Sequence, residues 1–314
     1  MRQLIVTLII AHLACACSSS ASIPRACPTP KKQTALQLED ASETSGYQSV
    51  VLVISRFGAG SLYKCTGTIV SHNTVVTAAH CIKAEPSSTY VVQNENFQAG
   101  EYARAISSGI SPKTILQHGT ISPSATSIDA SLNKDDLAIL IFDDNTFSQH
   151  DVAVPSLFKL KRPKQFADTI MVGYGRSSAS DTSQSSIRRA GPGFYLMSEA
   201  LGLGAVYTFS QPVNPETLHP EGQKKYSQAQ LGDSGGPLFV KSGSQLLLVG
   251  VASAGGPTDD GNTMTIYVDL FHQRSLDLFA KAKAQGAEFA APDNNSNSDD
   301  DNSLGKSSSN RCLN

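Results

Sequence analysis

Short apolar runs separated by turn-forming residues make up most of the chain between residues 47 and 270. Runs of about four to eight residues rich in Val, Ile, Thr and Tyr, bounded by Gly, Ser, Asn or Asp, are typical of β-strands. The pattern predicts a first group of strands at residues 50–55, 64–70, 74–80, 90–92 and 136–142, and a second group at residues 169–175, 194–198, 205–209, 236–240, 245–253 and 264–270.

The spacing of these strands indicates the fold class. Short strands at regular intervals, with no helical segments between them, favour antiparallel barrels or a sandwich over alternating βα units. The two groups divide near residue 150, so we expect one barrel over about 46–150 and a second over about 151–270. Residues 100–133 are rich in Ser and Gly and are expected to form exposed loops.

The chain changes to helical spacing at residues 270–285. Apolar side chains between Phe271 and Phe279 fall on one face of such a helix, and Gly286 follows as a stop signal. We therefore predict a terminal helix that closes a folded domain of residues 46–290.

The first 17 residues have the pattern of an export signal. Arg2 supplies a positive charge, and residues 4–14 form a short apolar run. Cys15 and Cys17 each follow an alanine, which resembles a bacterial lipobox with Cys17 or Cys15 as the lipidated residue. Simple cleavage nearby, with release of a soluble protein, is the alternative. The protein is therefore expected to be secreted or to reside in the periplasm or outer envelope.

The segments that flank the domain differ from it in composition. Residues 18–45 are rich in Ser, Pro, Lys and Thr and are expected to be an extended leader. Residues 291–314 hold almost no apolar side chains and are expected to be disordered. Each segment contains one cysteine, Cys27 and Cys312. Their pairing as a tether and a free or intermolecular Cys312 thiol both remain open.

Charge and composition exclude several classes of partner. The net charge is −2 and the chain has no long basic run, so nucleic acid is not expected to bind. The chain lacks an apolar stretch long enough to predict a membrane-spanning helix. It contains no H-E-x-x-H segment, and its cysteines do not group as in a zinc site, so neither a metal nor a cofactor is predicted. We expect a monomer.

The most distinctive stretch is QAQLGDSGGPLFV, residues 228–240. It places Ser234 among small, turn-forming residues directly before an apolar strand. One interpretation is an ordinary Gly-rich turn. The other is an exposed nucleophile whose neighbouring backbone N–H groups face a substrate oxygen, a geometry that favours glycine.

A serine nucleophile requires a base and a group that orients the base. His80 ends the stretch TVVTAAHC, where two alanines let other side chains approach the ring. Asp136 stands at the start of the apolar run DLAILIF, where a charge is costly unless it has a partner. By itself His80 is more often a packed structural residue, and Asp136 an ordinary turn residue.

Together, the stretches TAAHC, DLAIL and GDSGGPL occur in the order His, Asp, Ser. This arrangement resembles the chymotrypsin-like, or trypsin-family, serine endopeptidases over roughly residues 47–286. Cys65 lies 16 residues before Cys81, which matches the family's disulfide next to the catalytic histidine. TIMVGYG and VGVASAGG resemble two further family segments, with Tyr174 and Ala254 in place of the usual tryptophans.

The resemblance implies an all-β fold of two six-stranded antiparallel Greek-key barrels followed by a C-terminal helix. It also implies hydrolysis of peptide bonds in proteins or peptides through an acyl-enzyme. Ser234 is expected to attack the carbonyl, His80 to transfer the proton, and Asp136 to orient the imidazole. The backbone N–H groups of Gly232 and Ser234 are expected to form the oxyanion hole.

The chain departs from the family where such enzymes are activated. Members usually expose an Ile-Val-Gly-Gly-like terminus whose ammonium pairs with the aspartate before the nucleophile, here Asp233. The corresponding stretch, residues 31–40, reads KKQTALQLED. We therefore expect either another cation beside Asp233 or an inactive protein.

The specificity pocket departs as well. Gln228 occupies the base position where trypsin-like members carry an aspartate, and Thr265 stands where open-pocketed members have glycine. Gly255 keeps the neck of the pocket clear, and Ser253 to Gly255 are expected to pair with the substrate backbone. These residues predict a preference for small or medium uncharged side chains before the scissile bond.

Two other functions compete with this interpretation. Residues 232–236 also fit the G-x-S-x-G elbow of α/β-hydrolases, but there the histidine follows the serine, and only His272 does so here. We reject that fold. The second alternative is a protease-like binding protein that has the fold without turnover.

Overall fold

The computed structural model describes residues 39–40, 47–57, 61–82, 85–93, 97, 100–118, 135–148, 152–177, 186–197, 204–211, 213, 225–258 and 262–291. All of them belong to one compact unit that begins at Thr34. The predicted signal, most of the leader, the tail, and both Cys27 and Cys312 lie outside the described residues. No helix among the described residues is long and apolar enough to cross a membrane.

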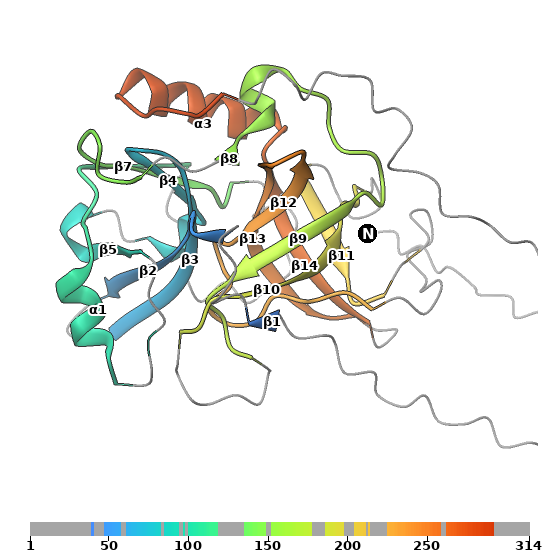
Figure 1. The fold of residues 1–314 in the computed structure, drawn as a ribbon, viewed down its shortest axis with the longest axis horizontal. Coiled ribbons are helices and arrows are strands. Elements are labelled where there is room, and N and C mark those ends of the chain that lie inside the picture. Colours follow the sequence, from blue (N-terminus) through green and yellow to red (C-terminus); the bar gives the residue numbers. More distant parts are fainter. Residues whose placement is uncertain are drawn as a thin grey trace, which may run out of the picture. The chain divides into compact units, whose positions relative to one another are not determined.

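The first group of predicted strands forms a curled, fully antiparallel sheet, drawn in blue to green in Figure 1. Most residues of its strands are buried, and many carry β-branched or aliphatic side chains, which fit a pleated, buried surface. Their order across the sheet is β5 (Thr89–Val92), β2 (Val50–Phe57), β3 (Ser61–Ser71), β4 (Thr74–Thr77), β7 (Ala138–Ile141) and β6 (Thr114–Gln117).

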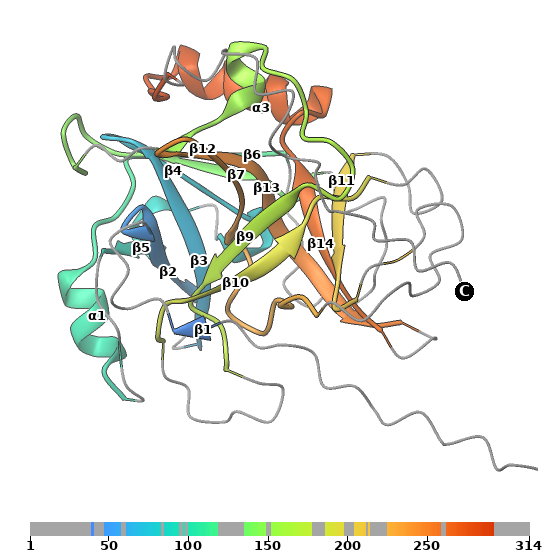
Figure 2. The ribbon, with the colours of Figure 1, turned by 45° about the vertical axis from the view of Figure 1, so that its right-hand side comes forward.

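The second group forms the other half of the fold, drawn mainly in green, yellow and orange in Figures 1 and 2. Six antiparallel strands make its curled sheet, in the order β10 (Arg189–Phe194), β9 (Asp168–Gly173), β12 (Pro237–Ser242), β13 (Gln245–Pro257), β14 (Thr263–Asp269) and β11 (Ala205–Phe209). Two-residue strands extend it: β1 (Glu39–Asp40) beside β10, and β8 (Val152–Ala153) parallel to β13. The predicted all-β fold of two six-stranded antiparallel barrels is confirmed.

The predicted terminal helix is present as α3 (Gln273–Ala284). It packs against β6 and β7, and both views show it above one end of the first sheet (Figures 1 and 2). Leu278, Phe279 and Ala282 form its buried face. The helix begins later than the spacing predicts, because His272 acts as its N-cap and accepts a hydrogen bond from the Arg274 N–H.

Two expectations from the sequence were wrong. The stretch at residues 100–133 is not all loop, since α1 (Tyr102–Ser108) packs on β5 and strand β6 completes the sheet. The strand expected at residues 194–198 instead runs over Arg189–Phe194. Its sequence, RAGPGF, lacks a β-branched residue, but a Cβ at Gly193 would lie 2.8 Å from Thr169 Oγ1, so glycine permits close pairing with β9.

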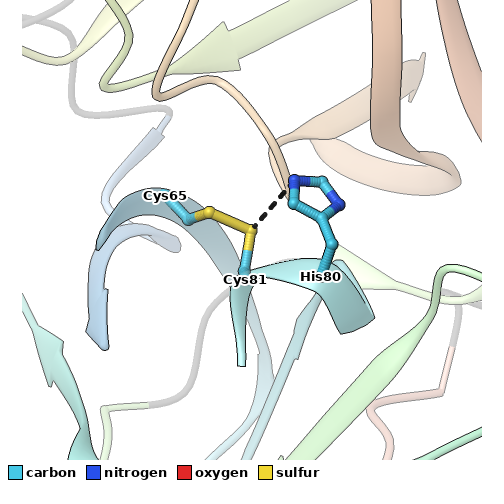
Figure 3. Close-up of side chains that lie close together, drawn as sticks. All are labelled: Cys65, His80 and Cys81. Carbon is cyan, nitrogen blue, oxygen red and sulfur yellow. Dashed lines mark hydrogen bonds between the residues drawn. A yellow bond between two sulfur atoms is a disulfide. The ribbon is translucent and has the colours of Figure 1, made fainter. Parts of the chain in front are cut away.

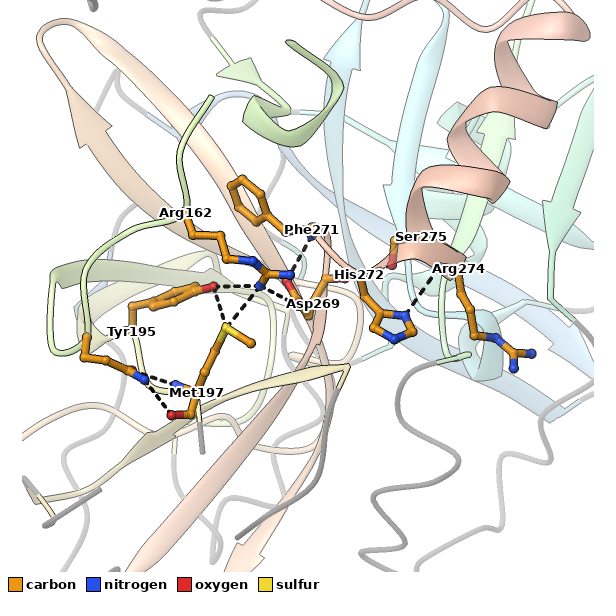
Figure 4. A network of polar contacts seen from close by, with 9 residues as sticks. Arg162, Tyr195, Met197, Asp269, Phe271, His272, Arg274 and Ser275 are labelled. Carbon is orange, nitrogen blue, oxygen red and sulfur yellow. Dashed lines mark hydrogen bonds and ion pairs between the residues drawn. The ribbon is translucent and has the colours of Figure 1, made fainter. Parts of the chain in front are cut away.

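A polar cluster at the end of β14 joins the second sheet to the start of α3 (Figure 4). Arg162 Nη1 donates to Asp269 Oδ2 at 2.7 Å, and its guanidinium lies 5.1 Å from the centre of the Phe271 ring. The fully buried Asp269 also accepts the Phe271 N–H at 2.9 Å, and the Ser275 hydroxyl donates to the Asp269 carbonyl at 2.8 Å. The ion pair and the hydrogen bond to the carboxylate offset the free-energy cost of burying its charge.

Candidate active site

Strand pairing in the first sheet brings His80 and Asp136 together. His80 lies in the 3₁₀ turn η2 (Ala79–Cys81) that follows β4, and Asp136 lies two residues before β7. Since β4 and β7 pair with Thr77 opposite Ala138, the residues just beyond the two strand ends face each other. Asp136 Oδ2 accepts from His80 Nδ1 at 2.7 Å, and Asp136 Oδ1 accepts from the His80 backbone N–H at 2.8 Å.

A third donor on the Asp136 carboxylate comes from the second sheet. The Ser253 hydroxyl, on β13, donates to Asp136 Oδ2 at 2.5 Å. Asp136 is 3% exposed, so these bonds satisfy a carboxylate that water scarcely reaches. With a carboxylate on Nδ1, the neutral imidazole carries its proton there and leaves Nε2 as the basic nitrogen. The sequence had suggested Ser253 only as a contact for the substrate backbone.

A disulfide between Cys65 and Cys81 ties η2 to β3, as predicted. Figure 3 shows the two half-cystines beside the His80 ring, with His80 Nε2 3.7 Å from Cys81 Sγ. The imidazole and the two sulfur atoms lie within 4.8 Å of one another. Because both sulfurs are used in the disulfide, they cannot act as thiolate ligands for a metal ion.

The aromatic ring of Tyr63 lies beside His80. The two rings meet edge to face, with centroids 6.4 Å apart and an interplanar angle of 84°. Burial and the charge of Asp136 raise the pKa of the Tyr63 hydroxyl. Tyr63 is therefore a neutral wall of the site, and no pattern in the sequence had singled it out.

Ser234 lies in a tight turn that leads into β12. Gly232 and Gly235 on either side of it have φ values of +103° and +81°, a region that residues with a Cβ rarely adopt. Backbone bonds hold this turn: the Asp233 N–H donates to Gln230 O at 2.9 Å and the Gly236 N–H donates to Asp233 O at 2.8 Å. The turn around Ser234 therefore needs glycine at positions 232 and 235, because both have a positive φ.

Two backbone N–H groups of this turn remain available. Among the described residues, neither the Gly232 N–H nor the Ser234 N–H donates to an acceptor, although Gly232 is buried. Buried N–H groups are nearly always paired, so such donors are suited to an anionic oxygen from outside the chain. In the described part of the chain, no hydrogen bond joins Ser234 Oγ to His80. Bonds of this kind are often long in an unliganded site.

Asp233 is buried beneath the turn, at 3% exposure. Its carboxylate accepts the Gly175 N–H at 2.7 Å and the Gln230 N–H at 2.8 Å. Burial raises the pKa of the Asp233 carboxyl to about 6, opposed by these two N–H groups and by the charges of Arg189 and Lys64. Arg189 Nη1 also donates to Gly175 O at 2.9 Å.

The sequence predicted either another cation beside Asp233 or an inactive protein. The stretch at residues 31–38, where the sequence departs from the family, lies outside the described residues. Within them, Arg189 and Lys64 supply the positive charge that acts on the Asp233 carboxyl. Both charges lower the pKa of this carboxyl, against the effect of burial.

The expected pocket residues Gln228 and Thr265 are brought together. Gln228 is fully buried, and its Oε1 accepts the Thr265 hydroxyl at 2.9 Å, while its Nε2 donates to Ser227 O at 2.6 Å. Thr265 Oγ1 in turn accepts the Ala229 N–H at 3.1 Å. Gly255 pairs with Thr265 across β13 and β14. Gln228, which the sequence assigned to the pocket base, and Thr265 thus satisfy each other and carry no net charge.

Sequence reasoning missed one further residue at this site. Thr66, directly after Cys65 on β3, is fully buried, and its backbone N–H donates to Ser234 O at 2.8 Å. Its hydroxyl donates to Gly232 O at 2.8 Å. Nothing in the local sequence distinguishes Thr66 from Thr68, the other threonine of its strand, because both contacts are to residues far along the chain.

Comparison with known proteins agrees with this geometry. The family model described as Trypsin matches residues 39–275, well over half of the 314-residue chain. No curated protein matches the chain. The match spans both sheets and includes His80, Asp136 and Ser234. The chain belongs to the trypsin family of serine proteases.

Proposed function

We propose that this protein is an exported serine endopeptidase that uses Ser234, His80 and Asp136 through an acyl-enzyme intermediate. The observation that carries the proposal is the buried Asp136 carboxylate, which accepts His80 Nδ1 at 2.7 Å and the Ser253 hydroxyl at 2.5 Å. This contact orients the imidazole with a basic Nε2, which is what a serine nucleophile requires.

In the proposed reaction, Ser234 Oγ forms a bond to the carbonyl carbon of the scissile peptide while His80 Nε2 takes the hydroxyl proton. The imidazolium then gives that proton to the leaving amine, and the C–N bond breaks to leave an ester on Ser234. His80 takes a proton from water as the water oxygen attacks the ester, and it returns that proton to Ser234 Oγ as the ester C–O bond breaks and the acid product leaves. Asp136 balances the positive charge on His80 in both steps.

The carbonyl oxygen becomes negatively charged in both tetrahedral intermediates. The backbone N–H groups of Gly232 and Ser234, which have no acceptor among the described residues, are the proposed donors to it. Loss of one such donor costs about 3–4 kcal/mol of transition-state stabilisation in enzymes of this kind. The catalytic contribution of the glycine-rich turn is thus electrostatic.

The pocket supports a substrate with a small or medium uncharged side chain before the scissile bond. Gln228 and Thr265 hydrogen-bond to each other at 2.9 Å and offer no carboxylate to a basic side chain. In a panel of peptide substrates that differ only at this position, we expect alanine, valine and leucine to give higher kcat/KM than arginine or lysine. A hundredfold preference for arginine would contradict this assignment.

Covalent labelling tests the function directly. A fluorophosphonate probe, which reacts with activated serines, is expected to label the exported protein, and mass spectrometry of a digest is expected to find the adduct on Ser234. Ser234→Ala removes the oxygen that the probe modifies, and His80→Ala removes the base that activates it. Neither variant should be labelled. A folded wild-type protein that remains unlabelled would favour the protease-like binding protein without turnover.

A further inference from the structure

Thr66 contacts the nucleophile turn through both its backbone and its side chain. Its N–H donates to Ser234 O and its hydroxyl donates to Gly232 O, each at 2.8 Å. The same hydroxyl oxygen accepts the Tyr174 N–H at 2.9 Å. The Thr66 carbonyl, on the opposite side, accepts the Thr77 hydroxyl at 2.7 Å. Every polar group of this fully buried residue is therefore engaged.

Three consecutive peptide planes of the turn carry the N–H groups of Gly232, Asp233 and Ser234. A planar peptide fixes its N–H direction when its carbonyl is held. Leu231 O accepts the Arg176 N–H at 3.0 Å, which fixes the plane of the Gly232 N–H, and Asp233 O accepts the Gly236 N–H at 2.8 Å, which fixes the plane of the Ser234 N–H. Between them lies the Gly232–Asp233 plane.

That middle plane is the one whose orientation depends on Thr66. It follows Gly232, whose φ of +103° and missing Cβ leave it the most freedom to rotate. Its carbonyl accepts the Thr66 hydroxyl, and its N–H donates to Gln230 O at 2.9 Å. A rotation of this plane changes ψ of Gly232 and φ of Asp233, and any part of the rotation that these two angles do not absorb turns the neighbouring N–H groups.

Thr66 also connects the nucleophile turn to the part of the site that holds His80. The residue before it, Cys65, is bonded to Cys81, which adjoins His80. A path of one hydrogen bond and one disulfide therefore runs from Ser234 through Thr66 to the residue beside His80. This path is one of the connections that hold the serine near the histidine.

We propose that Thr66 is a positioning residue that holds the Gly232–Asp233 peptide, so that the N–H groups of Gly232 and Ser234 face the acyl oxygen together. This inference rests on the proposed function, which supplies the acyl oxygen. Without the hydroxyl, a buried carbonyl and the buried Tyr174 N–H both lose their partner, which favours rotation of the peptide.

The test compares Thr66→Val, which keeps the shape and removes the hydroxyl, with Thr66→Ser, which keeps the hydroxyl. Thr68→Val is the matched control, because Thr68 lies two residues along β3 and its buried hydroxyl has no partner among the described residues. Should Thr66→Val fail to fold, Thr66→Ala replaces it with a smaller side chain at the same site.

We expect Thr66→Val to lower kcat by between about 10- and 100-fold. This loss is smaller than that from removal of an oxyanion donor, because both N–H groups stay in the chain and only their orientation changes. KM should change by less than about threefold, since an interaction made mainly in the transition state is lost. Thr66→Ser and Thr68→Val should stay close to the wild type. Amide hydrogen exchange of the peptide covering residues 228–236 should become faster in Thr66→Val alone.

Two results would overturn the role of Thr66: equal kcat and equal exchange in Thr66→Val and Thr66→Ser, or the same losses in Thr68→Val. A wild-type protein without turnover or labelling would instead refute the proposed function. Hydrogen exchange does not depend on catalysis, so it would still decide whether Thr66 holds the turn. The two failures are thus distinguishable.

Discussion

Replacement of Asp136 by asparagine is expected to lower kcat by about 10⁴-fold with little change in KM, the loss typical of this residue in Ser-His-Asp triads. Asp136 accepts hydrogen bonds on both oxygens, from the His80 N–H and from His80 Nδ1. Asparagine has only one acceptor oxygen and must place its NH₂ group toward one of these donors. Facing Nδ1, the NH₂ group forces the imidazole proton onto Nε2, where the base is needed.

Steady-state kinetics on a peptide ester and the rate of fluorophosphonate labelling both measure this loss. Asp135→Asn is the matched control, because Asp135 adjoins Asp136 in sequence but forms an ion pair with Arg274. We expect Asp135→Asn to keep nearly full activity. An Asp136→Asn protein that kept a tenth or more of the wild-type kcat would show that His80 is not the proposed base.

Gly235→Ala is expected to lower the free energy of unfolding by roughly 4 kcal/mol, through overpacking and backbone strain together. A Cβ at this position would lie 2.1 Å from Thr77 Oγ1, 2.3 Å from Thr66 O and 2.9 Å from Ala78 N. Two of these atoms belong to the backbone of the first sheet and cannot move aside without breaking strand pairing. The φ of +81° adds a further cost for any residue with a side chain.

Gly243→Ala separates the two causes of this loss. Gly243 also has a positive φ, +59°, but a Cβ there would meet nothing within 4 Å. Only the backbone cost applies to it, about 1 kcal/mol. Denaturant unfolding of the oxidised protein measures both variants, and the same stability in Gly235→Ala and Gly243→Ala would contradict the close packing of the nucleophile turn on the first sheet.

The most predictable features were those that depend on neighbours in sequence. Short apolar runs between turn-forming residues predicted most strands of both sheets, and the glycines around Ser234 predicted a tight turn. The histidine and the aspartate were recognisable only together with GDSGGPL, because the three stretches in that order resemble a known family. Strand β10 was misplaced because pairing with β9 overrides the low β-propensity of RAGPGF.

Contacts between distant segments were not predictable in this way. The Ser253 hydroxyl reaches Asp136 across 117 positions of sequence, and the Thr66 hydroxyl reaches Gly232 across 166 positions. Nor did any local pattern indicate that Arg189 and Lys64 supply the charge beside Asp233. Serine, threonine and arginine are common surface residues, so their identity alone does not predict a buried role.

The sequence by itself determined where most strands lie along the chain, the turn chemistry around Ser234 and the types of residue available for acid–base work, because these follow from local propensity and spacing. Only the tertiary structure decided which donor meets which acceptor. It placed Ser253 on Asp136, Thr66 on Gly232 and Arg189 on Gly175, since these contacts arise where curled sheets bring remote strands within hydrogen-bond distance.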